Sequence, residues 1–306
     1  MTKTLIAVVG PTASGKTGLG IDLAQRYGGE VIGADSRQVY RHMDIGTAKP
    51  TVEERSRAAH HLVDIVDPDE PFSLGQWLDL AKEALDDVWA RGRQPILVGG
   101  TGQYVWSLIE GWRVPRVAPQ PELREELSER SPEDLLAELR RVDPEAESFI
   151  DPKNVRRVIR ALEVYAETGK PFSYWRRKDA PSFETVIVGL RVPREALYER
   201  IDARVDAMIA GGMVDEVKSL LERGYSRELP SMSGIGYGEM CGYVAGEATL
   251  EDATERTKTR THGFARHQNS WFKPSDERIR WADSQDDTIR TIAEALDCLG
   301  AQGRTK

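Results

Sequence analysis

The chain has few of the features that stabilise secreted proteins, membrane proteins or zinc proteins. Of its 306 residues only two are cysteines, Cys241 and Cys298. Two cysteines are too few for a disulfide framework, and these two lack the spacing of a zinc site. No apolar run is long enough to span a bilayer, and the chain enters an apolar strand pattern at once, unlike a signal peptide. We therefore expect a cytoplasmic protein with no membrane partner. No feature demands an oligomer, so we expect a monomer.

Basic residues are in the minority but are unevenly distributed. The net charge is −8, which argues weakly against a nucleic-acid partner. Residues 153–178 nevertheless contain eight Lys or Arg and two acidic residues, and residues 256–273 contain five Lys or Arg and no acidic residue. These two stretches are a local basic footprint typical of nucleic-acid binding. Either stretch taken alone could equally be a solvated helix face.

The clearest motif is a phosphate-binding loop of the pattern G-x-x-x-x-G-K-[ST], between the apolar run 5–9 and a helical pattern. Its glycines let successive N–H groups point at phosphate oxygens, and the following helix offers its positive end. Lys16 adds a cation, and the Thr17 hydroxyl can hold Mg²⁺. A glycine turn that binds nothing is the weaker alternative. We predict that a phosphorylated ligand, whose identity the motif leaves open, binds to Gly10, Pro11, Thr12, Ala13, Ser14, Gly15, Lys16 and Thr17.

Short apolar runs alternate with helical patterns along most of the chain. This alternation predicts an α/β fold with a P-loop NTPase-like, doubly wound parallel sheet, whose ligands bind beyond the carboxyl ends of the strands. Asp35 and Thr101 each follow an apolar run and are expected at that edge. A turn or helix-capping aspartate and an ordinary tight turn are the respective alternatives. The predicted strands are 5–9, 30–34, 61–66, 95–98, 185–190 and 279–281.

A helical block interrupts the strands. Residues 114–121 contain three prolines and no apolar periodicity, as in a linker, and no strand pattern returns until 185–190. We therefore predict a first core part at 1–114, an all-helical insertion domain at 115–183, and a second core part at 184–306.

Arginines recur on the predicted helices. Arg156, Arg157 and Arg160 can share one face of a helix in the insertion, and Arg200 and Arg204 lie four residues apart in the second core part. The later stretch RHQNSWFK, residues 266–273, combines basic and aromatic side chains that suit RNA binding.

These motifs together resemble the tRNA dimethylallyltransferase (tRNA isopentenyltransferase) family, in order and over nearly the whole chain. The departures are modest: His267 and Lys273 stand where the family usually has basic and arginine residues, and Gly234 replaces a commoner alanine. They concern RNA contacts, not chemistry. The resemblance rests on GPTASGKT (10–17), ADSRQVYRHMDIGTAKP (34–50), HHLVDIVDPDEPFS (60–73), LVGGTGQY (97–104), VRRVIRALEVYAETGKP (155–171) and RHQNSWFK (266–273).

The resemblance implies transfer of a dimethylallyl group from dimethylallyl diphosphate to the exocyclic amine of the adenosine 3′ of the anticodon in tRNA. The phosphate loop would then hold pyrophosphate instead of a nucleoside triphosphate, consistent with the lack of a clear Walker-B aspartate after 95–98. Asp35 would act as the base, and Thr101 would hold the flipped adenine. The leaving group would be stabilised by Lys16, Arg204 and Mg²⁺ on Thr17.

The resemblance also implies which residues contact the anticodon stem-loop of the tRNA. These are Asp35, Ser36, Arg37, Gln38, Thr101, Arg124, Arg156, Arg157, Val158, Ile159 and Arg160.

Three other functions remain open at this point. A P-loop kinase of a small metabolite would transfer phosphate from ATP, and a related enzyme would prenylate free AMP or ATP. Neither needs the helical insertion or the basic C-terminal helix. In a non-catalytic RNA-binding ATPase, Asp35 would serve only metal or water. Transfer to tRNA without ATP separates these functions.

Overall fold

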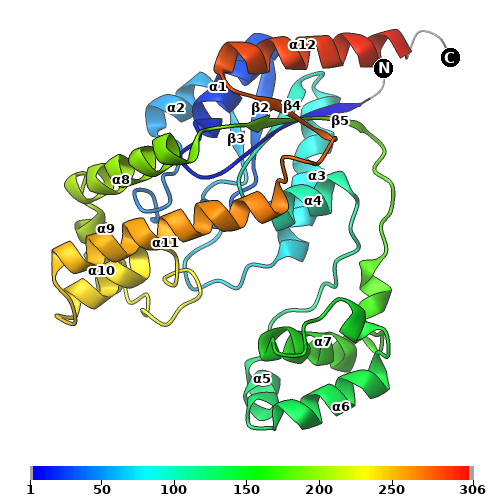
Figure 1. Cartoon of the computed structure of the whole chain (residues 1–306), viewed down its shortest axis with the longest axis vertical. Coiled ribbons are helices and arrows are strands. Elements are labelled where there is room, and N and C mark those ends of the chain that lie inside the picture. The colour runs from blue at the N-terminus through cyan, green and yellow to red at the C-terminus, as the bar shows by residue number, and fades with distance from the viewer. Residues whose placement is uncertain (1–2, 303–306) are drawn as a thin grey trace. The chain divides into compact units, whose positions relative to one another are not determined.

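The computed structural model describes residues 3–302, which divide into two compact units (Figure 1). The core unit contains the chain up to Glu70, Leu80–Val105 and the chain from Ser182 on. The insertion unit contains Pro71–Asp79 and Trp106–Pro181. It therefore begins nearer the N-terminus than the predicted insertion at 115–183 and includes an earlier segment.

A parallel sheet forms the centre of the core unit. Its six strands all pair in parallel, in the order β3-β2-β4-β1-β5-β6. This topology confirms the predicted doubly wound sheet. The strands are β1 (Thr4–Val9), β2 (Gly29–Gly33), β3 (His60–His61), β4 (Gln94–Val98), β5 (Glu184–Leu190) and β6 (Ile279–Ala282).

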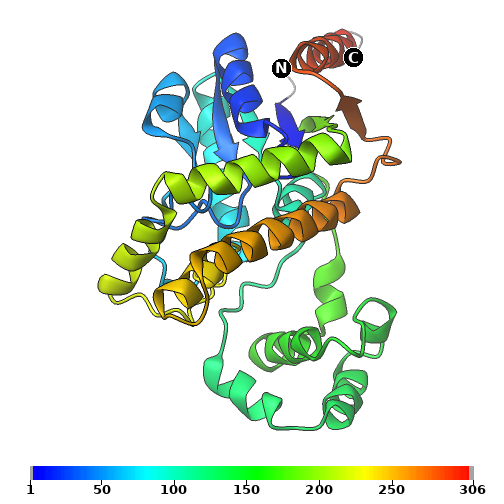
Figure 2. The same cartoon turned by 60° about the vertical axis from the view of Figure 1, so that its left-hand side comes forward.

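Helices cover both faces of the sheet. Ile6 and Val8 of β1 share one apolar cluster with Leu19 and Leu23 of α1 (Lys16–Tyr27), whereas the alternate β1 residues point to the opposite face and are also fully buried. A strand buried on both faces explains the continuous apolar run at 5–9. In both views α1 and α12 (Gln285–Gln302) lie on one side of the sheet and α11 (Leu250–Trp271) on the other (Figures 1 and 2).

Further helices lie in the connections between the strands. α8 ends at Ala210 and α9 begins at Met213, because Gly212 has a φ of 99° and interrupts the helical backbone. The glycine pair Gly211–Gly212 therefore separates the two helices. The bounds are α2 (Val52–Arg57), α3 (Leu74–Ala90), α4 (Gly102–Ile109), α8 (Arg194–Ala210), α9 (Met213–Glu222) and α10 (Tyr237–Val244).

The third predicted strand, 61–66, is wrong in extent. Only His60–His61 pairs with β2, because Leu62 and Asp64 adopt φ values of 62° and 57° that turn the backbone out of the extended conformation. Apolar alternation alone could not reveal this turn, which depends on hydrogen bonds from elsewhere in the chain.

The insertion unit has a small apolar core of its own. Leu127, Leu135 and Leu162 are buried in it together with Val158 and Ile159. The side chains of Val158 and Ile159, both predicted to contact tRNA, are instead packed against the helices of this unit. The elements are α5 (Pro121–Ser128), α6 (Pro132–Val142), the 3₁₀ helix η1 (Ala146–Ser148), α7 (Val155–Thr168) and the 3₁₀ helix η2 (Phe172–Arg176).

A buried carboxylate joins the helices of the insertion unit. Glu163 of α7 is fully buried, and it accepts hydrogen bonds from the guanidinium groups of Arg124 and Arg160. Burial would raise the pKa of Glu163, but these hydrogen bonds outweigh it and hold the pKa below its usual value. Arg124 and Arg160, both predicted to contact tRNA, therefore stabilise the unit itself.

A second buried carboxylate links β2 to the sheet edge and to α3. The Glu30 side chain is 4% exposed; its carboxylate accepts hydrogen bonds from Arg91 and lies 2.7 Å from Nε2 of His61. The hydrogen bonds from Arg91 hold the pKa of Glu30 at about 2, against an opposing effect of burial. The folded state therefore binds fewer protons than the unfolded state at mildly acidic pH.

We predict that Glu30→Gln lowers the free energy of unfolding by about 1–3 kcal/mol at pH 7, because a charge-assisted pair is lost. The lowered folded-state pKa contributes stability that is full above the unfolded pKa near 4.5 and is lost as the pH falls toward 2. The difference in free energy of unfolding between the variant and the wild type, measured by urea unfolding, should therefore narrow from pH 6 to pH 3. Glu83→Gln, on an exposed position of α3, is the control. A gap that stays constant over this range would contradict the prediction.

Candidate active site

The phosphate loop connects β1 to α1 through three residues of positive φ. Gly10, Ala13 and Gly15 have φ values of 146°, 61° and 93°, and Gly15 is the N-cap of α1 without any side-chain cap. The first turn of α1 carries no acidic residue. No carboxylate in that turn therefore competes with a bound anion for the positive end of the helix. A cavity of about 480 Å³, the phosphate cavity, opens here and is lined by Gly15, Lys16 and Thr17.

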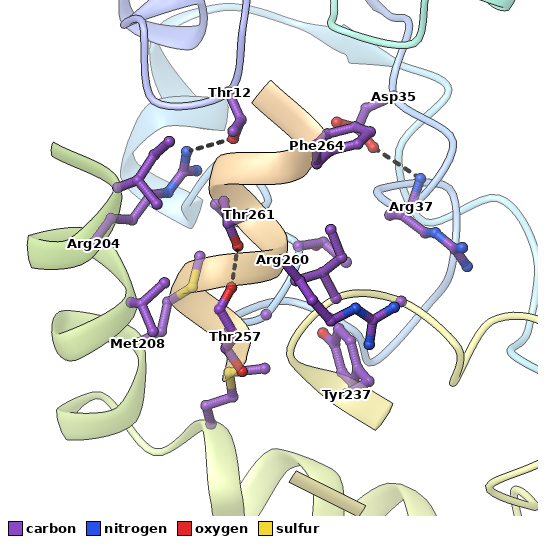
Figure 3. A pocket seen from close by; sticks show the side chains of 18 of the residues that line it. Thr12, Asp35, Arg37, Arg204, Met208, Tyr237, Thr257, Arg260, Thr261 and Phe264 are labelled. Carbon is purple, nitrogen blue, oxygen red and sulfur yellow. Dashed lines mark hydrogen bonds between the residues drawn. The ribbon is translucent and has the colours of Figure 1, made fainter. Parts of the chain in front are cut away.

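Two cations flank the phosphate loop. The Lys16 ammonium donates to the Pro11 carbonyl at 2.6 Å, and Arg204 of α8 donates to the Thr12 hydroxyl at 3.5 Å (Figure 3). Burial lowers the pKa of Lys16 to about 7, with Asp35 opposing and Arg204 adding to this shift. Burial also lowers the pKa of Arg204, whereas the negative charges of Asp35 and Glu54 act to raise it. Two desolvated cations beside a helix N-terminus form a site for a bound anion.

Asp35 and Thr101 lie together at the carboxyl edge of the sheet, as the sequence predicts. Asp35 follows β2 and accepts a 2.8 Å hydrogen bond from the N–H of Arg37, so it also has the turn role of the alternative interpretation. The Thr101 hydroxyl accepts from the N–H of Ser36 at 3.0 Å, and its own N–H donates to Ala34 at 3.1 Å. Thr101 therefore holds the segment that carries Asp35.

A second cavity of about 300 Å³, the apolar cavity, adjoins the phosphate cavity (Figure 3). Its wall includes apolar side chains from α8, α9, the segment before α10, and α11, among them Ile201, Met208 and Phe264. Asp35 lines both cavities. A phosphate-binding loop and an apolar cavity that share one carboxylate suit a ligand with an anionic end and an apolar end. The residues that line both cavities are Thr12, Asp35, Thr47, Arg204 and Phe264.

One wall of the apolar cavity is the loop 43–49, which Glu216 of α9 holds from one side. The Glu216 carboxylate accepts the N–H groups of Asp44, Ile45 and Gly46 at 2.9, 2.8 and 3.3 Å. It also accepts the hydroxyl of Tyr237 at 2.7 Å. Burial, together with this carboxylate, raises the pKa of Tyr237. The sequence does not indicate this role of Glu216, because nothing in a helical pattern marks a side chain that caps a distant loop.

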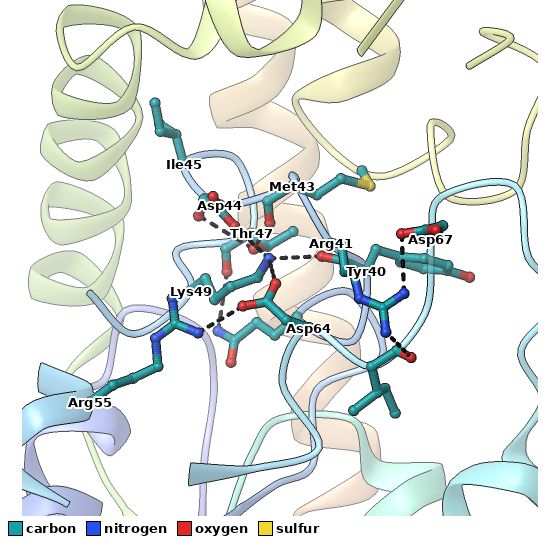
Figure 4. Close-up of polar contacts among 12 residues, drawn as sticks. Tyr40, Arg41, Met43, Asp44, Ile45, Thr47, Lys49, Arg55, Asp64 and Asp67 are labelled. Carbon is teal, nitrogen blue, oxygen red and sulfur yellow. Dashed lines mark hydrogen bonds and ion pairs between the residues drawn. The ribbon is translucent and has the colours of Figure 1, made fainter. Parts of the chain in front are cut away.

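Lys49 also holds this loop (Figure 4). Its side chain is 1% exposed, and its ammonium donates to Asp44 and Asp64 at 2.5 Å each and to the Tyr40 carbonyl at 2.7 Å. Arg55 donates to the second oxygen of Asp64 at 2.7 Å. The turn at 62–64 that shortens the predicted third strand thus brings Asp64 to the buried ammonium.

Gln268 of α11 ties the phosphate loop to the glycine turn after β4. Its side-chain carbonyl accepts the N–H of Thr12 at 2.7 Å, and its amide nitrogen donates to the Gly100 carbonyl at 3.0 Å. A Cβ at Gly100 would lie 2.2 Å from this amide, and a Cβ at Gly102 would lie 2.3 Å from Trp271. The glycine turn therefore lets α11 approach the backbone, a role that the glycine pattern in the sequence does not indicate.

The predicted RNA-binding role of 266–273 needs correction for part of the stretch. Phe272 is 1% exposed and Gln268 is buried, so both belong to the interior. Nearer the start of α11, Lys258 pairs with Asp206 and Arg260 with Glu239. The basic character of this helix is therefore partly neutralised by neighbouring carboxylates, which a count within the stretch could not reveal.

Two further residues predicted to contact tRNA have partners within the chain. The Arg37 guanidinium donates to the carbonyls of Pro230 and Ser231, at 2.8 and 3.3 Å. The Gln38 amide donates to the carbonyls of Thr47 and Ala48 at 3.2 and 3.1 Å. Both side chains hold the surroundings of Asp35 in place.

Two protein-family models match this chain. The family model described as IPP transferase matches residues 38–275, and the model described as isopentenyl transferase matches residues 3–63. The chain belongs to the IPP transferase family. The isopentenyl transferase match includes Asp35, and both matches include Thr47, which also lines the two cavities.

Members of the IPP transferase family align over most of the chain. The tRNA dimethylallyltransferase of Roseiflexus sp. (strain RS-1) is 56% identical over 273 residues, which cover 88% of this chain and 90% of the relative. The tRNA dimethylallyltransferase of Chloroflexus aggregans (strain MD-66 / DSM 9485) is 50% identical and covers 94% of this chain and 99% of the relative.

Solved structures share the fold. The full-length tRNA isopentenylpyrophosphate transferase from Bacillus halodurans superposes with a TM-score of 0.71 and 40% identity, covering 96% of each chain. A eukaryotic dimethylallyltransferase, described as acting on tRNA, superposes with a TM-score of 0.84 and 31% identity, covering 98% of this chain and 80% of that one. Within residues 3–302, no helix is long and apolar enough to cross a membrane.

We predict that Glu216→Gln speeds hydrogen exchange at the amides of Asp44, Ile45 and Gly46, because an amide cannot accept all the bonds that the carboxylate accepts. Global stability should fall by about 1–3 kcal/mol. Glu222→Gln removes the same charge from an exposed position of α9 and should leave these amides unchanged. Equal exchange in the two variants would show that Glu216 does not hold the loop.

Proposed function

We propose that this protein transfers the dimethylallyl group of dimethylallyl diphosphate to the exocyclic amine of the adenosine 3′ of the anticodon in tRNA, with release of pyrophosphate. One observation carries the proposal: a phosphate-binding loop and an apolar cavity meet at Asp35. The tRNA dimethylallyltransferases to which the chain is similar support this choice of substrates. An anionic leaving group, an apolar carbon group and a base can thus occupy one continuous site.

The diphosphate is proposed to bind to the phosphate loop. The backbone N–H groups of residues 10–17, the N-terminus of α1, Lys16 and Arg204 would hold its oxygens. The partly desolvated Lys16 gains a compensating anion, so binding raises its low pKa and favours the charged ammonium. These groups stabilise the charge that develops on the leaving oxygen as the carbon–oxygen bond breaks.

The acceptor amine is a poor nucleophile, because its lone pair is delocalised into the adenine ring. Asp35 is proposed to remove its proton as the new carbon–nitrogen bond forms. Thr101 holds the segment that carries Asp35 through the N–H of Ser36, so its side chain can orient the base and contact the adenine. The adenine must leave the anticodon stack to reach this carboxylate.

Mg²⁺ is proposed to assist at Thr17. The Thr17 hydroxyl lines the phosphate cavity, and an oxygen ligand of this kind fits Mg²⁺, which takes its remaining ligands from phosphate and water. Among the described residues no group of three His, Cys, Asp or Glu side chains could hold a metal ion. The ion would therefore enter with the diphosphate, and when bound it would neutralise charge on the leaving group.

The insertion unit is proposed to bind the tRNA backbone through Arg156 and Arg157. Both side chains are exposed on α7, whereas Arg124 and Arg160 are paired with the buried Glu163. Exposed arginines can contact phosphate without losing an internal partner. The proposed tRNA surface of the insertion is therefore narrower than the sequence suggests.

We predict that the wild-type protein transfers label from dimethylallyl diphosphate to tRNA without ATP, and that ATP competes poorly for the site. Asp35→Ala should slow transfer about 100- to 10,000-fold, because proton removal is lost. Filter binding should show nearly unchanged affinity for tRNA. Phosphate transfer from ATP would instead indicate a kinase. An Asp35→Ala variant that keeps most of the wild-type rate would show that Asp35 only stabilises its turn and does not act as the base.

We predict that Arg156→Ala/Arg157→Ala raises the apparent KM for tRNA strongly and leaves the KM for the prenyl donor nearly unchanged. The slope of log affinity against log salt should become shallower by up to about 1.8 on a duplex, and by less on a single-stranded loop. Replacing Arg160 is avoided, because it would remove one of the two guanidinium groups that pair with the buried Glu163.

Arg140→Ala/Arg141→Ala is the matched control in the same unit. These two arginines lie on α6 and pair with Glu147 and Glu138, so their removal takes away the same formal charge from paired positions. A salt slope that changes equally in both double variants would show that net charge, not contact by α7, sets tRNA affinity.

A further inference from the structure

The two cavities of the active site meet at a boundary that contains one aromatic side chain. Five residues line both cavities, and four of them (Thr12, Asp35, Thr47 and Arg204) have polar or charged side chains. The fifth is Phe264 of α11. Figure 3 shows its side chain in the cavity wall.

The position of Phe264 is unusual for a phenylalanine. The residue is 39% exposed and is one of two exposed large hydrophobic residues in the described part of the chain, Val52 being the other. Phe272, eight residues later at the C-cap of the same helix, is 1% exposed. Because part of its ring is left out of the core, Phe264 contributes less hydrophobic stabilisation to the fold than a fully buried phenylalanine would. Its exposed surface faces the two cavities.

This inference rests on the proposed function. In the proposed reaction, the charge at the boundary between the two cavities changes. The bond from the allylic carbon to the diphosphate oxygen breaks, and its electron pair stays on the oxygen. The lone pair of the adenine amine forms the new carbon–nitrogen bond, and the amine proton passes to Asp35. The allylic carbon therefore carries partial positive charge while it crosses from the phosphate cavity toward the acceptor.

The two cations that bind the diphosphate oppose that positive charge. Arg204 lines both cavities, and Lys16 lines the phosphate cavity. The departing diphosphate and the Asp35 carboxylate supply negative potential to this carbon, and any further stabilisation must come from the rest of the cavity wall. The face of an aromatic ring provides such a potential without attracting water or competing for the diphosphate.

We propose that the face of the Phe264 ring stabilises the partly positive allylic carbon during transfer, through a cation–π interaction. The ring acts on the transition state more than on either bound substrate, so its effect is expected in the rate of the chemical step. Two other roles make different predictions. A platform that stacks on the adenine would act on tRNA affinity, and a purely steric wall would depend on side-chain volume alone.

The test measures single-turnover transfer with saturating tRNA and dimethylallyl diphosphate. Phe264→Leu retains an apolar side chain and loses the ring, so the rate should fall about 5- to 30-fold. Phe264→Tyr retains the ring and should keep most of the rate. Phenylalanines with one, two and three ring fluorines at position 264 should lower the logarithm of the rate in proportion to the fluorine count, because each fluorine weakens the negative potential of the ring face.

Val52→Ala is the control, because Val52 is the other exposed large hydrophobic residue, at 74% exposure, and lines neither cavity. Its rate should equal that of the wild type. A Phe264→Leu rate equal to wild type, a rate independent of fluorine count, or a change confined to the KM for tRNA would each overturn the inference while transfer itself persists. Absence of transfer by the wild type would overturn the proposed function, and the inference with it.

Discussion

The active site depends on one buried amide that joins three separate segments of the core unit. Gln268 of α11 accepts from the N–H of Thr12 and donates to the carbonyl of Gly100. A side-chain amide can satisfy a backbone donor and a backbone acceptor at once. The phosphate loop, the turn after β4 and α11 are therefore held at fixed separation. The same helix carries Phe264 to the boundary between the cavities.

The small residues around this amide have a common physical cause. Gly100 and Gly102 lie where a Cβ would collide with Gln268 and Trp271, so a side chain there would push α11 away from the sheet. Thr101, between the two glycines, is the one position of the turn that carries a side chain toward Asp35 and Ser36. Close packing by α11 and the placement of Thr101 are consequences of the same arrangement.

Charged side chains in this protein have two distinct uses. Some are buried and paired within the fold, as Lys49 with Asp44 and Asp64, where both partners lower the cost of leaving water. Lys16 and Arg204 instead face a cavity, where burial lowers the pKa of each. This difference separates charges that stabilise the folded chain from charges that are available to an anionic substrate.

The sequence by itself determined the sheet and the phosphate loop. Five of the six predicted strands agree with the observed ones to within a residue or two, because a strand buried on both faces leaves an unbroken apolar run. The phosphate loop could be predicted because its chemistry depends on residues adjacent in sequence. Asp35 and Thr101 could be placed at the sheet edge for a related reason: the carboxyl ends of parallel strands share one edge.

Only the tertiary structure decided which side chains are available to substrates and which stabilise the fold. Arg156 and Arg160 belong to one basic pattern, yet Arg160 pairs with a buried carboxylate and Arg156 is exposed. Glu216 holds a loop some 170 residues earlier in the chain, and the turn at Leu62 ends a strand that its apolar pattern would continue. Each of these outcomes depends on partners distant in sequence, and local periodicity contains no information about which distant groups a side chain will meet.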